Sequence, residues 1–95
     1  METQSDSLSR EFVISNKLGL HARPAAMFVR LSSRFPCEIW VDKDGEQVNG
    51  KSIMGLMMLA AASGAKLIVS AEGAQAAQAL DAIGILIASG FQEDA

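Results

Sequence analysis

Apolar and polar residues alternate along the chain with two different periods. A period of two predicts strands, and a period near 3.6 predicts helices with one apolar stripe. Residues 11–16 show the first pattern through Phe12 and Ile14, and residues 76–87 show the second through Leu80 and Ile83. The whole pattern predicts strands at 11–16, 37–42, 46–49 and 66–71 and helices at 24–35, 52–59 and 76–87.

Turn-forming residues support these boundaries. Asp44-Gly45 is a strong two-residue hairpin signal, Pro36 ends the helix before it, and Gly90 closes the last helix. The order βαββαβα favours an α/β (α+β) fold, an open-faced two-layer sandwich in which a four-stranded, mainly antiparallel sheet carries three helices on one face. We expect Glu38 and Trp40 to point outward from the open face.

Composition is that of one compact domain, because the 95 residues are 49% apolar and only 20% charged. We expect residues 1–10 to form a flexible N-terminal extension, residues 11–91 the domain and residues 92–95 a C-terminal tail.

Several classes of function are disfavoured by composition. The net charge of −3, with no Lys/Arg cluster to offset it, argues against a nucleic-acid partner. The first ten residues lack an apolar signal stretch, and the longest apolar run, residues 53–62, is far below the roughly 20 residues that span a bilayer, so we expect a cytoplasmic protein without membrane insertion. Cys37 is the sole cysteine, so we predict no intrachain disulfide and no multi-cysteine metal site. We also expect no metal and no other cofactor.

The stretch GLHARPAA, residues 19–26, holds the only histidine, His21, where the loop becomes the first helix. Pro24 falls in the first turn, where a helix tolerates proline. The positive end of a helix disfavours an imidazolium, so we expect a neutral ring that can act as a nucleophile near pH 7.

A phosphoryl group on His21 would meet unpaired helix-start amides and the guanidinium of Arg23. Such a transfer requires no general acid, metal or second histidine. On the pattern alone, His21 is more typical of a surface or capping histidine than of a nucleophile, and Arg23 can be read as a solvated arginine, so the pattern does not decide the function.

Two motifs do decide it: GLHARPAA and NGKSIMGLMMLAA, residues 49–61, resemble the signature stretches of the HPr family, the histidine phosphocarriers of the bacterial phosphotransferase system. The resemblance implies a carrier rather than an enzyme. It implies that Nδ1 of His21 accepts a phosphoryl group from phosphorylated enzyme I and passes it to an A-type enzyme II component, with Arg23 assisting. It also implies regulatory phosphorylation of Ser52, by a partner such as HPr kinase/phosphorylase; from the residues alone, Ser52 is an N-cap.

The methionine-rich second helix is expected to serve docking in part. Family resemblance assigns apolar residues of this helix to the surface that meets enzyme I, and we assign Met58 to the core. Gly55 has no explanation apart from the resemblance. The predicted docking surface consists of Ala26, Arg30, Ile53, Met54 and Met57.

Two alternatives follow from the same residues. The first is a free-standing histidine phosphatase. It is disfavoured because the chain has no second histidine and so small a domain offers no deep pocket. A regulatory binding module would act through Ser52 and the methionine-rich helix, with little phosphoryl transfer. The sequence leaves open whether the carrier serves sugar transport or nitrogen regulation, although residues 38–41 and 55–62 resemble the nitrogen branch more closely.

Overall fold

The computed structural model describes residues 7–92 of the chain, and the predicted βαββαβα order is confirmed. A short 3-10 helix follows the last predicted element. The elements are β1 (Ser7–Val13), α1 (Ala22–Ser32), β2 (Glu38–Lys43), β3 (Glu46–Asn49), α2 (Ile53–Met58), β4 (Lys66–Glu72), α3 (Ala76–Ala88) and η1 (Gly90–Gln92).

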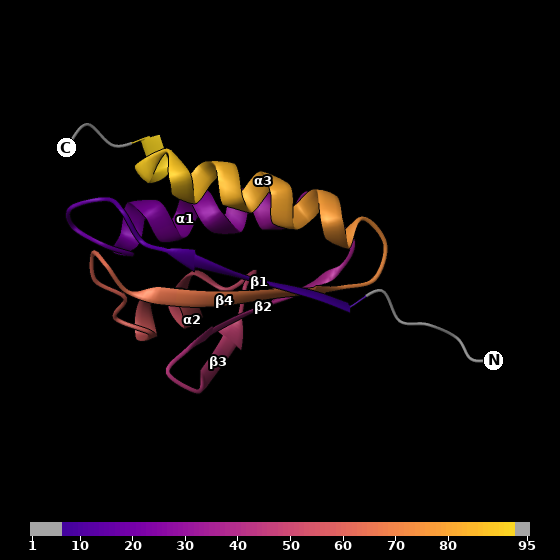
Figure 1. Ribbon diagram of the computed structural model, residues 1–95, viewed down its shortest axis with the longest axis horizontal. Helices are drawn as coiled ribbons and strands as arrows, with labels where there is room; N and C mark the ends of the chain where they lie inside the picture. The colour runs from indigo at the N-terminus through magenta and orange to yellow at the C-terminus, as the bar shows by residue number, and fades with distance from the viewer. Residues whose placement is uncertain (1–6, 93–95) are drawn as a thin grey trace.

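The four strands form one antiparallel sheet in the order β1-β4-β2-β3. Helices α1 and α3 lie over one face (Figure 1), and α2 contacts α1 and β3. Alternation along β2 buries Ile39 and Val41 toward the core and leaves Trp40 half-buried and Glu38 exposed. The predicted open-faced sandwich is thereby confirmed.

Strand β1 begins earlier than the sequence pattern predicted. Residues 7–10 pair with β4, with Ser7 opposite Glu72, so the expectation of a flexible extension over residues 1–10 is wrong for these four positions. Their side chains are exposed and polar or peripheral, and main-chain pairing does not depend on an apolar pattern. Arg10 Nη1 also forms an ion pair of 2.6 Å with Asp81 Oδ1 on α3. Residues 1–6 lie outside the described part of the chain.

Other boundaries also differ. Residues 14–16 follow β1 as irregular chain, although Ile14 remains buried. Helix α1 ends at Ser32 and not at residue 35. The Ser32 side chain is buried, and its hydroxyl donates a hydrogen bond to the Gly50 carbonyl at 2.8 Å. Gln92 belongs to η1 rather than to a tail, and residues 93–95 lie outside the described residues.

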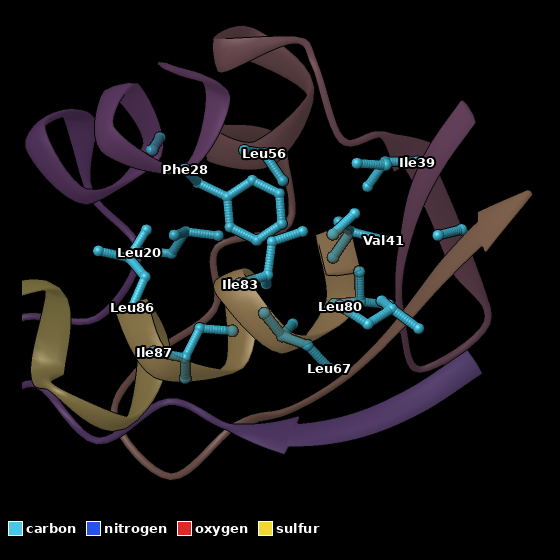
Figure 2. Close-up of a cluster of buried hydrophobic side chains, with 14 of the residues drawn as sticks. Leu20, Phe28, Ile39, Val41, Leu56, Leu67, Leu80, Ile83, Leu86 and Ile87 are labelled. Carbon is cyan, nitrogen blue, oxygen red and sulfur yellow. The ribbon is translucent and has the colours of Figure 1, made fainter. Parts of the chain in front are cut away.

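Phe28 on α1 is central to the core and is fully buried. Figure 2 shows its ring between Leu56 of α2 and Ile83 of α3, with Leu20 nearby. Burying a side chain of this size stabilises the fold by roughly 1.5–3 kcal/mol. The core therefore fixes the three helices relative to one another. No helix among residues 7–92 has the length and apolar character needed to cross a membrane.

Candidate functional site

The chain that leads into α1 is fastened to the connection between α2 and β4. The Ile14 amide donates to the Ala65 carbonyl at 2.9 Å, and the Leu20 amide donates to the Ala61 carbonyl at 2.8 Å. The Leu20 side chain is buried in the core. These two hydrogen bonds therefore hold both ends of the loop that connects β1 to His21.

Gly19 makes this close approach possible. Its φ is +73°, and a Cβ built on it would lie 2.4 Å from the Ala61 carbonyl oxygen, so only glycine fits. The Gly19 carbonyl accepts hydrogen bonds from Asn16 Nδ2 at 2.7 Å and from the His21 amide at 3.0 Å. Gly19 thus supports the histidine from two positions away, a role that the sequence pattern alone does not indicate.

His21 is the N-cap residue of α1, at the junction of loop and helix where the sequence pattern predicts it. Its backbone is extended, with φ −86° and ψ −166°, and its carbonyl accepts the first helical hydrogen bond from the Ala25 amide at 3.0 Å. The imidazole forms no capping hydrogen bond with the backbone of residues 22–25 and is partly exposed. Pro24 is buried in the first turn and fixes the start of the helix. The imidazole of His21 therefore lies at a helix start that is held in place by packing.

The first turn of α1 offers hydrogen-bond donors to a ligand. The amides of Ala22 and Arg23 precede the first helical hydrogen bond, and neither donates to another residue within 7–92. Pro24 has no N–H to contribute. The exposed Arg23 side chain lines an open groove together with Lys17. This arrangement suits an anion carried on His21.

Charge is segregated in the molecule. Residues 12–37 contain four cations and no carboxylate, although the net charge of the chain is −3. The cations are Lys17, Arg23, Arg30 and Arg34. A basic region around α1 attracts anionic groups and acidic partners locally. Within residues 7–92, no cluster of His, Cys, Asp and Glu could hold a metal ion.

Ser52 caps α2, as predicted from its position. Its Oγ accepts a hydrogen bond from the Gly55 amide at 3.0 Å. The structure also explains Gly55, because a Cβ there would lie 3.3 Å from both Val48 Cβ and Ser52 Oγ. The absence of a side chain lets the capped turn pack closely against β3.

The predicted docking surface is largely exposed. The exposed fractions of Ile53, Met54 and Met57 are 40%, 74% and 44%. Met58 is 68% exposed, so its assignment to the core is wrong. Leu56 is buried instead, and a residue two positions later points about 200° around the helix from it.

The structure brings only part of the predicted site together. Helix α2 contacts α1, which carries the half-buried Ala26 and the exposed Arg30. The predicted docking residues therefore lie on two neighbouring helices. Ser52 lies at the start of the second of them, whereas His21 and Arg23 lie at the start of the first.

A family model described as the PTS HPr component phosphorylation site matches residues 8–89. The chain belongs to the HPr family. It is 49% identical over 86 residues to the phosphocarrier protein HPr of Neisseria meningitidis serogroup A, covering 90% of this chain and 97% of that protein. It is 50% identical over 84 residues to the phosphocarrier protein HPr of Pseudomonas aeruginosa, covering 87% and 93%.

Solved structures agree with this assignment. The crystal structure of HPr-C-His from Thermoanaerobacter tengcongensis matches with a TM-score of 0.89 and 46% identity, covering 93% of this chain and 99% of that one. This HPr-family chain is thus a phosphocarrier of the phosphotransferase system and not an enzyme.

Proposed function

We propose that this HPr-family phosphocarrier accepts a phosphoryl group from phosphorylated enzyme I on Nδ1 of His21 and delivers it to an A-type enzyme II component. The observation that supports this most is the position of His21 at the start of α1, beside the available amides of Ala22 and Arg23. A phosphate bound there gains both hydrogen bonds and the favourable end of the helix dipole.

The transfer is an in-line displacement at phosphorus. The lone pair of Nδ1 attacks, which requires the neutral tautomer with its hydrogen on Nε2. The bond between phosphorus and the donor group of enzyme I breaks, and its electron pair stays on the donor. The new phosphohistidine carries about two negative charges, which the helix-start amides and the Arg23 guanidinium stabilise. Delivery to the enzyme II component follows the same path in reverse.

Docking precedes this transfer and uses a different part of the surface. The docking surface, formed by Ala26, Arg30, Ile53, Met54 and Met57, combines exposed apolar side chains with a cation. An acidic, partly apolar face on enzyme I would complement it.

Ser52 is proposed as a regulatory phosphorylation site for a kinase such as HPr kinase/phosphorylase. A phosphate there adds about −1.5 to −2 charge at the start of α2, where it is tolerated by the helix. The same charge stands directly beside Ile53 of the docking surface. We therefore expect phosphorylation to weaken enzyme I docking while the fold is retained.

The central proposal is tested by incubating the full chain with enzyme I and phosphoenolpyruvate. We expect one acid-labile, base-stable phosphate that is absent from His21→Ala and present in Ser52→Ala. Labelling of His21→Ala to the wild-type level would overturn the assignment.

The second candidate function is a regulatory binding module that acts through Ser52 and α2. It is favoured by the exposure of Met54 and Met58, 74% and 68%, which exceeds what a purely structural helix requires. Partner binding without any labelling by enzyme I would support it. Assaying discharge into sugar-type and nitrogen-type A components separately would assign the branch of this cytoplasmic carrier.

A further inference from the structure

A groove between α1 and α3 has no part in the proposed phosphoryl transfer. It encloses about 260 Å³, and small-molecule sites usually offer about 300–1,000 Å³, so it suits a side chain better than a cofactor. Its apolar lining comes from both helices, and two cations flank that lining. The residues that matter here are Met27, Arg30, Leu31, Arg34, Ile85 and Leu86.

Ile85 is the most exposed large apolar side chain of α3. Its neighbours Leu86 and Ile87 are buried, whereas Ile85 is 72% exposed. A single exposed apolar residue is ordinary on a protein surface. Here the exposed isoleucine faces the same groove as the half-buried Met27 and Leu31 of α1, so an apolar strip crosses from one helix to the other.

Arg30 and Arg34 give the groove its charge. Both are exposed, and neither forms an ion pair with a described residue in 7–92. Arg30 lies on α1 and Arg34 in the turn that follows it, and both line the groove, so their like charges disfavour each other. No carboxylate occurs within residues 12–37 to compensate them. An acidic partner would complement both arginines at once.

We propose that this groove is a second docking site, which binds an amphipathic acidic segment of a partner protein. One apolar side chain of that segment enters between Leu31 and Ile85, and carboxylates beside it pair with Arg30 and Arg34. Arg30 also belongs to the docking surface proposed for enzyme I, so the two surfaces are continuous. A partner bound in the groove therefore competes in part with enzyme I.

The test uses the full chain and two synthetic helical peptides. One peptide carries leucine and glutamate on a single face, and the other has lysine in place of every glutamate. Amide chemical shifts and calorimetry report binding. We expect only the glutamate peptide to bind, with shifts at Leu31, at Ile85 and at Ala82, which also lines the groove. Ile85→Glu should weaken its binding at least tenfold.

Matched variants separate the groove from the phosphoryl-transfer site. Ile68→Glu places the same charge at an isoleucine that is 46% exposed on the open sheet face, and it should leave peptide binding unchanged. Labelling by enzyme I should be equal in wild type, Ile85→Glu and Ile68→Glu. Equal binding of both peptides, no binding, or shifts confined to α2 would overturn the proposal. Concentration-dependent self-association abolished by Ile85→Glu would overturn it in favour of a second copy of this chain.

Discussion

The starts of α1 and α2 solve the same physical problem in opposite ways. At α2, the Ser52 hydroxyl accepts the Gly55 amide at 3.0 Å, so the helix satisfies one of its own open donors. At α1, the N-cap side chain of His21 makes no such bond with the first turn, and the amides of Ala22 and Arg23 have no acceptor among residues 7–92. The start of α2 is thus capped by its own side chain, whereas the start of α1 keeps amide donors available for a bound anion.

The difference extends to the surroundings of each start. The α1 start depends on the tight approach of Gly19 to Ala61, which fixes the backbone and leaves the imidazole partly exposed. The α2 start depends on the close packing of Gly55 against Val48. Rigid support with open donors is what a transferable group requires, whereas a satisfied cap mainly contributes stability.

The largest expected effect comes from loosening the support of the α1 start. Gly19→Ala combines a φ of +73° with a Cβ 2.4 Å from the Ala61 oxygen, so we expect the free energy of unfolding to fall by more than about 3 kcal/mol. Gly64→Ala is the control, because its φ is +90° but nothing lies within 4 Å of the new Cβ. That variant should lose about 1–2 kcal/mol. Equal losses in urea unfolding would show that the Ala61 contact is unimportant.

The next effect comes from removing one donor at the α1 start without disturbing the helix. Ala22→Pro deletes an amide at the first helical position, where proline is well tolerated, and the extended backbone of His21 is compatible with a following proline. Losing one charge-assisted hydrogen bond of about 1.5–3 kcal/mol should lower the phosphorylation equilibrium roughly ten- to a hundredfold.

Ala22→Ser, which retains the amide, is the matched control for this measurement. Phosphohistidine formation is followed by NMR at equilibrium with enzyme I, and unfolding is measured in parallel. An equilibrium that is unchanged in Ala22→Pro, at wild-type stability, would mean that this amide does not bind the phosphate.

The sequence predicted part of the fold and of the two helix starts, but not all of it. The order of elements, the antiparallel sheet, the helix-start position of His21 and the cap at Ser52 followed from periodicity and turn chemistry. Residues 7–10 were missed because their pairing with β4 is a main-chain interaction that leaves no apolar pattern. Met58 was misplaced because a six-residue helix gives too few positions to fix its buried face.

The contacts between distant residues that support the site could not be predicted from the sequence either. The contact between Gly19 and Ala61 joins residues 42 positions apart, and no local pattern encodes such an approach. The groove between α1 and α3 likewise depends on two helices whose relative placement is set by the core around Phe28.

A smaller effect is expected from the charge of Arg23. Its side chain is exposed, so its interaction with the phosphate is screened and worth about 1 kcal/mol. Arg23→Ala should slow transfer from enzyme I by roughly three- to tenfold, while His21 can still be labelled. Arg23→Lys should recover part of the rate, and added salt should reduce the difference between wild type and Arg23→Ala. Rates that are equal for all three proteins at low salt would remove Arg23 from the mechanism.

The smallest effect separates the two roles of Ser52. Ser52→Ala removes the hydrogen bond to Gly55 and should cost about 1 kcal/mol, or about 4–8 °C in Tm, with enzyme I affinity unchanged. Ser52→Asp keeps an N-cap acceptor and favours the helix dipole, so its Tm should remain near wild type while its negative charge weakens enzyme I docking. Thermal unfolding and titration calorimetry with enzyme I measure the two quantities independently. If Ser52→Asp instead unfolds early and binds enzyme I normally, the start of α2 is structural only and carries no regulatory charge effect.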